Sequence, residues 1–378
     1  MKKFFLIMWR NLPLALVVVF CVCVISFMLP YLPSEVTSDN AQTKYNGIIE
    51  LWHIDCFETG AGAKSQFLSQ EARVFEKANK GTLAHITILT YEQMLYKLKE
   101  GQTFDIISFP LGVGVDIVNY LAEYSGKINL ADNFYECGQM GERTYATPYM
   151  SGGYCLIAEK GNLDKFSNFS SLSADLYNLG FDKKVGKNTV SINSLICGYA
   201  QFSSPLTAVA LLSNKANQDA RIDIAPTNTQ YTAYQKFVSN SATALLGTQR
   251  DIFRLSNRVS SGKIGELVFS PLNTYTDLIQ LMGVSREVST AKRMLCQNFI
   301  EQVSTERAQR ALVDIGMFSV CGQRIYTEGI YLDMQNALTQ VKVPNAFITK
   351  ESLYSLKECS REGLYKNENK NIDMFLRG

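Results

Sequence analysis

Histidine and tryptophan are scarce in this sequence, with two residues of each among 378. Catalytic zinc sites draw on several histidines, so His53 and His85 alone cannot supply a histidine-rich metal centre. The Gly-x-Ser-x-Gly turn that carries the nucleophile of many hydrolases does not occur. Two Gly-x-Gly pairs, at residues 60–62 and 112–114, lack the third glycine of a dinucleotide-binding fingerprint. We therefore predict no enzymatic activity, no metal centre and no cofactor.

Strong charge and a cysteine framework are also missing. The sequence has 37 Lys and Arg against 35 Asp and Glu, a formal net charge of +2, which gives no electrostatic reason to expect nucleic-acid binding. Beyond the N-terminal region the cysteines are odd in number, widely spaced and without a Cys-x-x-Cys pair, so a zinc cage or a disulfide framework is not expected. We interpret them as core thiols: Cys56, Cys137, Cys155, Cys197, Cys296, Cys321 and Cys359.

One long apolar run is present, near the N-terminus. Residues 12–32 carry no charged side chain and are long enough to cross a bilayer as a helix, which needs about 20 apolar residues. The basic residues within 1–11 place that end in the cytoplasm by the positive-inside rule. Residues 30–33, Pro-Tyr-Leu-Pro, form a poor cleavage site. We predict an uncleaved transmembrane anchor, with a cleaved signal peptide as the alternative, and a polar linker at 33–44. The protein would then be a single-pass protein of the cell membrane, with its main part outside the cytoplasm.

From residue 48 the hydrophobic pattern alternates between strands and helices. Short apolar runs predict strands, and apolar side chains at three- and four-residue steps predict amphipathic helices. The β-α-β-α-β-α order favours a parallel, doubly wound sheet, in which ligands lie beyond the carboxyl ends of the strands. Residues 53–62 and 108–110 would occupy those ends. The strands are expected at 48–54, 86–88 and 105–109, and the helices around 67–75, 91–98 and 117–121.

The second half of the chain shows fewer but clear signals. Thr248 and Asp251 match the Ser/Thr-x-x-Asp/Glu pattern that caps a helix, and Ile252 and Leu255 follow at helical spacing. Further helices are expected at 291–303 and around 308–312. Beyond Pro344 the chain is strongly charged, which fits either a surface helix or a partly disordered tail.

Several stretches, taken in this order, resemble a known family. They are the opening strand with Leu51-Trp52-His53, Lys99-Glu100-Gly101 before Phe104-Asp105-Ile106, the run Tyr145–Tyr154, and the stretches Phe299–Gln309 and Ile315-Gly316-Met317-Phe318, which look like the family's late helix pair. Together they resemble the family 1 extracellular solute-binding proteins of bacterial ABC importers, over about residues 48–343. The resemblance implies the two-lobed α/β fold of periplasmic binding proteins (type II), which holds a ligand by hinge closure between the lobes.

The resemblance also implies a division of the chain. Lobe 1 would hold residues 45–148 and 276–322, lobe 2 would hold 149–275 and 323–350, and 351–378 would form a charged tail. The connections between the lobes would lie at Thr147–Ser151 and Ser270–Tyr275. The sequence departs from the family in lacking a lipobox cysteine, and its short middle lobe argues against a cleft for a long oligosaccharide.

The candidate ligand contacts combine flat aromatic faces with hydrogen-bonding groups. Tyrosine offers both at low entropy cost, which suits a closing cleft. Arg250 at a helix start could hold an anionic group beside free backbone N–H groups, or it could pair with an acid while Thr248 only caps. Core packing is the alternative for Trp52, and solvation for the loop acids. The candidates are Trp52, His53, Asp55, Glu58, Ser108, Phe109, Tyr149, Ser151, Tyr154, Thr248, Gln249, Arg250, Asp251 and Tyr275.

The predicted function follows from the resemblance and the apolar segment. We expect a membrane-tethered solute-binding protein that passes a small polar solute, a sugar by preference, to the permease subunits of an ABC importer. We expect it to act as a monomer. An extracytoplasmic ligand sensor that acts with a separate signalling membrane protein is the alternative, and an extracellular enzyme is a third, weaker one.

Overall fold

The computed structural model describes residues 45–160, 182–185, 188–191, 195–211, 222–223, 229–242, 244–366 and 372. The chain divides into two units, 1–44 and Tyr45–Gly378, and the description that follows concerns the second. The expected anchor at 12–32 and its flanking segments lie outside the described residues. Among the helices of the described part, none is both long and apolar enough to cross a bilayer.

The first lobe is built on a five-stranded sheet in the order β2-β1-β3-β14-β6. Strands β1 to β3 are parallel, as the alternating pattern predicts. Strand β14, which comes from the second half of the chain and was not part of that pattern, runs antiparallel to β3 and β6. The strands are β1 (Gly47–Ile54), β2 (Thr82–Leu89), β3 (Ile106–Pro110), β6 (Thr147–Ser151) and β14 (Ile279–Val284).

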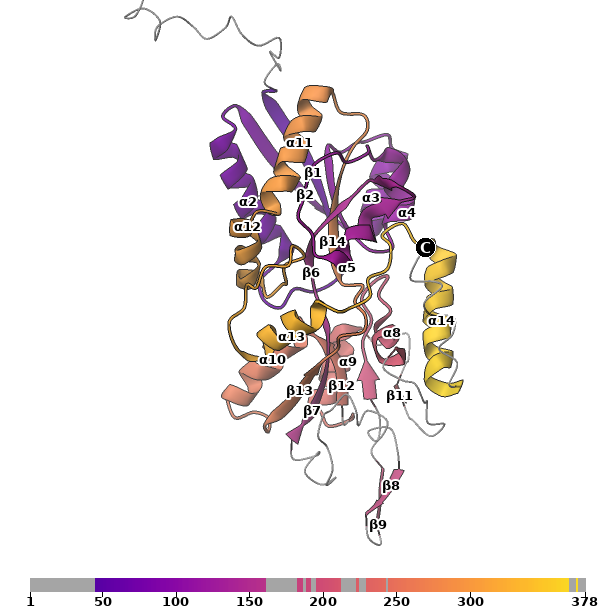
Figure 1. Cartoon of the computed structure of the whole chain (residues 1–378). Coiled ribbons are helices and arrows are strands. Elements are labelled where there is room, and N and C mark those ends of the chain that lie inside the picture. Colours follow the sequence, from indigo (N-terminus) through magenta and orange to yellow (C-terminus); the bar gives the residue numbers. More distant parts are fainter. Residues whose placement is uncertain are drawn as a thin grey trace, which may run out of the picture. The chain divides into compact units, whose positions relative to one another are not determined.

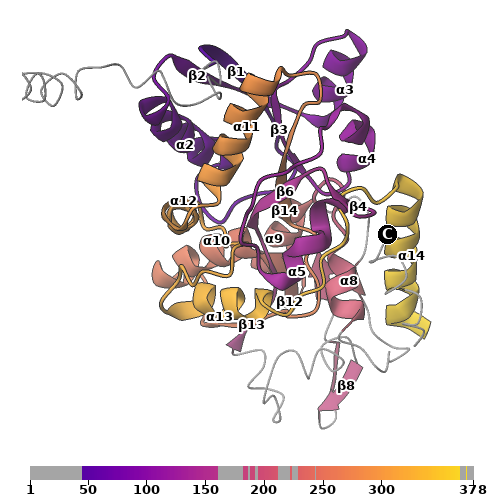
Figure 2. The same ribbon diagram turned by 45° about the horizontal axis from the view of Figure 1, so that its top comes forward.

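Helices cover both faces of this sheet (Figures 1 and 2). On one face α2 (Lys64–Ala78) packs beside α11 (Thr290–Val303), where the rings of Phe75 and Phe299 meet edge to face at 5.3 Å. On the other face lie α3 (Tyr91–Lys99) and the short α4 (Gly114–Ile117). In place of one helix around 117–121, the structure has the four-residue α4, which ends at Ile117, followed by the 3₁₀ helix Val118–Tyr120.

The second lobe is built on a sheet in the order β11-β10-β12-β7-β13. Its strands are β7 (Tyr154–Glu159), β10 (Leu195–Cys197), β11 (Ile222–Asp223), β12 (Ala244–Thr248) and β13 (Leu267–Pro271). The helices that accompany it are α8 (Pro205–Ala210), α9 (Gln230–Val238), α10 (Gln249–Ser260) and α13 (Gly329–Leu338). The remaining elements are α5 (Asp132–Tyr135), β4 (Gln139–Met140), β5 (Arg143–Thr144), β8 (Asp182–Val185), β9 (Asn188–Ser191), α12 (Glu306–Ala311), α14 (Lys350–Lys366) and the 3₁₀ helices Glu136–Gly138 and Leu312–Ile315.

The chain passes between the two sheets at least twice. It leaves β6 and enters β7 through Gly152 and Gly153, just after the segment expected to cross. It returns through residues 272–278, between β13 and β14. A Cβ atom on Gly152 would lie 2.8 Å from the side-chain amide of Gln249, so a larger residue would displace that side chain from its bonds to Glu58 and Gly153.

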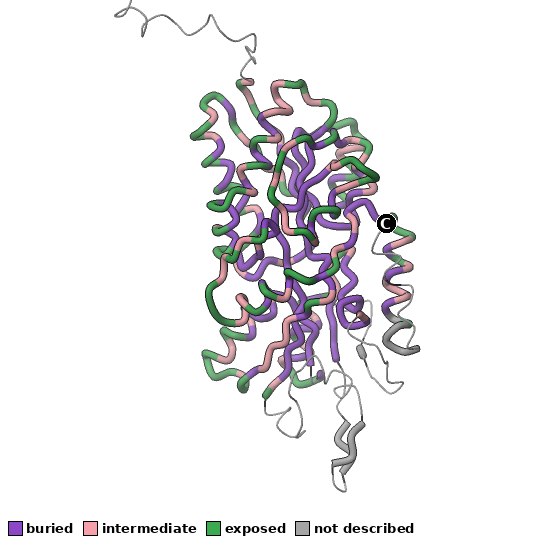
Figure 3. The backbone as a smooth tube through the Cα atoms, viewed as in Figure 1, coloured by how far each residue is buried: buried purple, intermediate pink, exposed green. Residues whose placement is uncertain are grey.

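The buried residues form cores around both sheets (Figure 3). Five of the seven predicted core cysteines are buried, and all seven are free thiols. Residues 350–366 of the charged tail form helix α14, whose Leu353 and Leu356 are buried where it packs along α8. The helical alternative therefore holds for residues 350–366, and the positions 367–371 and 373–378 lie outside the described residues.

Candidate ligand-binding site

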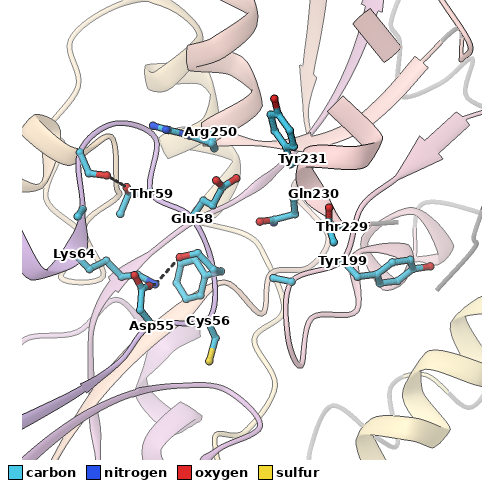
Figure 4. Close-up of a pocket in the computed structure, with 14 residues that line it drawn as sticks. Asp55, Cys56, Glu58, Thr59, Lys64, Tyr199, Thr229, Gln230, Tyr231 and Arg250 are labelled. Carbon is cyan, nitrogen blue, oxygen red and sulfur yellow. Dashed lines mark hydrogen bonds and ion pairs between the residues drawn. The ribbon is translucent and has the colours of Figure 1, made fainter. Parts of the chain in front are cut away.

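A pocket of about 430 Å³ lies where the first lobe meets the second. One wall is the segment Asp55–Lys64, which connects the carboxyl end of β1 to helix α2. The opposite wall comes from Tyr199 and Ala200, from Thr229–Tyr231 at the start of α9, and from Arg250 at the start of α10 (Figure 4). Ligand pockets commonly have volumes of about 300–1,000 Å³, so this one suits a small solute.

Lys64 gives the first wall its shape. Its ammonium is buried, donates to the Phe57 carbonyl at 2.7 Å and to Gln280 Oε1 at 3.4 Å, and pairs with Asp55 Oδ1 at 2.7 Å. The same group lies 3.6 Å from the centre of the Phe57 ring. Burial lowers the pKa of Lys64, and the Asp55 carboxylate partly opposes that effect. One buried cation therefore holds both Asp55 and Phe57 at the pocket wall.

A buried polar network lies beneath this wall and connects it to the sheet. The Ser108 hydroxyl is 2.9 Å from His53 Nδ1 and 2.9 Å from the Tyr149 hydroxyl, and Gln280 Nε2 donates to it at 3.0 Å. Burial, and secondarily the charge of Lys64, lowers the pKa of His53 to about 3, so the imidazole is neutral at physiological pH. The network fixes the ends of β1 and β3 relative to β14 and thereby supports the Lys64 contacts.

The second wall is formed by helix starts. The Thr229 hydroxyl caps α9 by accepting the backbone N–H of Thr232 at 3.1 Å, which fixes the turn that carries Gln230 and Tyr231. Tyr231 is 52% exposed, and its ring stacks on Tyr234 with centroids 6.1 Å apart. Figure 4 shows the Gln230 side chain extending from the second lobe toward the segment that carries Glu58.

Helix α10 reaches across to the first lobe. Arg250 Nη1 donates to the Gly60 carbonyl at 3.1 Å, and Gln249 Nε2 donates to the Glu58 carbonyl at 2.8 Å. Arg254 binds both carboxylate oxygens of Glu58, at 2.8 and 3.2 Å. The pocket therefore has a closed side, formed by direct contacts between the two lobes.

Three of the predicted contact residues line this pocket: Asp55, Glu58 and Arg250. Gln249 contacts the wall segment through Glu58 but does not line the pocket. Thr248 and Asp251 form the predicted capping box of α10, in which Asp251 Oδ2 accepts the Thr248 backbone N–H at 2.9 Å. They hold the helix start in place and do not line the pocket.

The other predicted contacts are side chains of the core. Trp52 is 3% exposed, with its ring 5.4 Å from that of Phe104, and Phe109 and Ser151 are fully buried. His53, Ser108 and Tyr149 belong to the network described above. The hydroxyls of Tyr154 and Tyr275 both donate to the buried carboxylate of Asp277, at 2.6 and 3.0 Å. These residues lie on strands or connections where they are buried, and they do not line the pocket.

Sequence reasoning missed several residues of the wall. They are Cys56, Phe57, Thr59, Gly62, Ala63, Lys64, Tyr199, Ala200, Thr229, Gln230 and Tyr231. Those between 56 and 62 fall within the segment expected at the carboxyl end of the first strand, although they were not singled out. Thr229 also carries a signal in the sequence. A threonine shortly before apolar residues at helical spacing, here Ala233, Tyr234 and Phe237, is typical of a helix N-cap.

No protein-family model and no curated protein sequence matches the chain. Solved structures do. The sugar-binding protein MalE from Xanthomonas citri aligns with a TM-score of 0.61 and 12% identity, over 87% of this chain and 97% of its own. A family 1 extracellular solute-binding protein from Bifidobacterium longum subsp. infantis aligns with a TM-score of 0.61 and 14% identity, over 88% and 98%. The GacH receptor of Streptomyces glaucescens aligns with a TM-score of 0.57 and 13% identity, over 88% and 97%. This chain therefore has the two-lobed α/β fold of the extracellular solute-binding proteins, the fold that its sequence pattern resembles.

Proposed function

We propose that this protein is an extracytoplasmic solute-binding protein that encloses a small polar solute between its lobes and delivers it to an ABC importer. The observation that carries the proposal is the pocket of about 430 Å³, whose two walls come from different lobes. In a two-lobed fold such a pocket opens and closes with hinge motion, which allows both capture and release. Binding of this kind requires no chemical step, and we propose no enzymatic activity.

The charges of the pocket support an uncharged solute. The charge of Asp55 is balanced by Lys64, and that of Glu58 by Arg254, so a cationic ligand would have to break an existing pair. The remaining cation of the lining, Arg250, donates to the Gly60 carbonyl. The second carboxylate oxygen of Asp55 has no hydrogen-bond partner among the described residues, and Thr229 and Gln230 add polar groups on the opposite wall. Tyr231 presents an exposed ring at the same wall. Hydroxyls together with an apolar face are the features of a sugar, and the volume favours a short saccharide.

Fold relatives support the same class of solute. The GacH receptor is described in complex with acarbose, and MalE3 of T. maritima is described with maltose bound. Those proteins share 13% and 10% identity with this chain, so their ligands guide the choice of test compounds.

The tether and the lobe boundaries belong to the same proposal. An uncleaved helix at 12–32 would hold the binding unit at the extracytoplasmic surface of the cell membrane, within reach of the permease subunits. The protein would act as a monomer. We propose lobes at 45–148 with 276–322 and at 149–275 with 323–350. The segment 351–378 would follow the second lobe as the charged C-terminal tail.

A thermal-shift screen of the unit Tyr45–Gly378 tests the proposal. Glucose, maltose, maltotriose and acarbose would be compared with glycine, spermidine and sulfate. A ligand at 100 times its Kd stabilises the folded state by about 2.7 kcal/mol, which is readily seen as a higher Tm. The proposal predicts that at least one saccharide raises the Tm and that Gln230→Ala reduces this rise. A shift caused by the charged compounds alone would contradict it.

A further inference from the structure

The contacts that close one side of the pocket have a consistent direction. Every donor belongs to helix α10 of the second lobe, namely the side chains of Gln249, Arg250 and Arg254. The acceptors belong to the first lobe: Glu58 and Gly60 lie between β1 and α2, and Gln249 also donates to the Met317 sulfur at 3.6 Å. All these atoms come from the chain itself, so the contact between the lobes does not require a solute to bridge it.

The side chains of Arg254 and Gln249 are held in place by contacts outside the segment that they bind in the first lobe. The Arg254 guanidinium lies 5.3 Å from the centre of the Tyr231 ring and 5.4 Å from that of Tyr234, both in its own lobe. Gln249 is fixed on two sides, because its Oε1 accepts the Gly153 N–H at 3.1 Å and its carbonyl accepts the Tyr331 hydroxyl at 2.9 Å. A guanidinium group that is already oriented loses little conformational entropy when it binds a carboxylate.

Glu58 is the point at which these contacts converge. Both of its carboxylate oxygens are bound by Arg254, while its backbone carbonyl is bound by Gln249. Two-point binding by arginine is among the stronger forms of ion pair. The side chains of Arg254 and Glu58 are 18% and 39% exposed, so salt in the solvent can still weaken the pair.

We propose that the Glu58–Arg254 pair is a latch that holds the two lobes together over the pocket without solute, and that it opens when solute enters or leaves. The latch deepens the proposed function, because it would set how readily the site becomes accessible. It also makes a claim of its own about the conformation of the chain, which can be measured without any ligand.

Arg254 is the better position for the test because, unlike Glu58, it does not line the pocket. Arg254→Gln removes the positive charge and the two-point contact with the Glu58 carboxylate but keeps a long polar side chain. Arg310→Gln is the matched control, since Arg310 also pairs with a glutamate, at 2.7 Å, but within helix α12 of a single lobe. Glu58→Gln removes the same pair from the other lobe and serves as a second variant if Arg254→Gln does not fold. A urea melt of each variant confirms that it is folded.

The measurement is small-angle X-ray scattering from the unit Tyr45–Gly378 without ligand, at 0.01 M and 1 M NaCl. Over that range the screening length falls from about 30 Å to about 3 Å. We expect Arg254→Gln and Glu58→Gln to have a larger radius of gyration than the wild type at low salt, and Arg310→Gln to match the wild type. High salt should expand the wild type toward the size of Arg254→Gln and leave that variant unchanged.

Two results would overturn the latch. One is a folded Arg254→Gln protein as compact as the wild type at both salt concentrations. The other is expansion of Arg254→Gln while Glu58→Gln stays compact, because a pair cannot hold with only one partner. Since no ligand is present, neither result bears on whether the pocket binds a sugar, and a negative saccharide screen would not bear on the latch.

Discussion

Substitution of Lys64 by methionine is the most informative single change in the pocket wall. Methionine has a similar length and keeps the apolar contact with the Phe57 ring, but it cannot donate a hydrogen bond. The Phe57 carbonyl, Gln280 Oε1 and Asp55 Oδ1 would each lose the donor that binds them, at 2.7, 3.4 and 2.7 Å. The substitution therefore tests whether this cation shapes the wall.

The expected loss of stability follows from two opposing effects. Each hydrogen bond to a charged group contributes about 1.5–3 kcal/mol, but burying an ammonium costs several kcal/mol, which cancels much of that gain. Asp55 is also 44% exposed, so water can solvate it once the lysine is gone. We expect Lys64→Met to lower the free energy of unfolding by about 1–3 kcal/mol, and to weaken solute binding because Asp55 is no longer held at the wall.

The pH dependence gives a second measure of the same group. Burial lowers the pKa of Lys64 in the folded protein below its ordinary value of 10.5. Between the lowered pKa and 10.5 the unfolded chain binds more protons at this site than the folded chain does. The contribution of Lys64 to the free energy of unfolding therefore rises with pH across that window. Lys64→Met should remove this rise.

Urea unfolding of the wild type and of Lys64→Met, at pH 7 and at several values up to pH 10.5, measures both quantities. A variant as stable as the wild type at pH 7, with the same alkaline pH profile, would refute the reasoning. It would show that the lysine contributes no more than its burial costs, and that backbone contacts alone shape the wall.

The remaining predictions concern the start of helix α10. Arg250→Ala should weaken solute binding, measured by calorimetry, about tenfold or more, which is the lower end of the range for hydrogen bonds to charged groups. Normal binding together with unfolding at lower urea concentration would show that Arg250 has only a structural role. Thr248→Ala should lower stability by about 1 kcal/mol through loss of the cap, and an unchanged melt would contradict that role. Burial raises the pKa of Asp251 to about 7, so its contribution to stability is present at acid pH and is lost as the pH rises toward and through 7. Asp251→Asn should flatten that part of the pH–stability profile, and an unaltered slope would show that another group titrates.

Local sequence signals were sufficient for the frame of the first lobe. The strand and helix periods between residues 48 and 99 matched β1, α2, β2 and α3 because each element shows one apolar face or a continuous apolar run. The rule that ligands lie beyond the carboxyl ends of strands selected the segment that holds Asp55 and Glu58. The capping pattern likewise located the start of α10 at Thr248.

What the sequence could not supply depends on contacts between distant segments. Strand β14 lies 169 residues beyond the end of β3, from Pro110 to Ile279, and no local pattern reveals that it inserts antiparallel into the first sheet. Trp52 ends in the core because Phe104 lies over its face of the sheet. No local pattern distinguishes Lys64 from the other charged residues, and only the fold shows that its amine is enclosed by Phe57, Asp55 and Gln280.

Calorimetric titration of a saccharide into the unit Tyr45–Gly378 tests the central claim most directly, with maltose as the first compound and Asp55→Asn and Gln230→Ala measured beside the wild type. If the pocket between the lobes is the binding site, the wild type binds one saccharide per chain, and both substitutions, made on opposite walls, weaken binding about tenfold, which corresponds to about 1.4 kcal/mol. Saccharide binding that both folded variants retain at wild-type affinity would contradict the account, because the solute would then bind elsewhere.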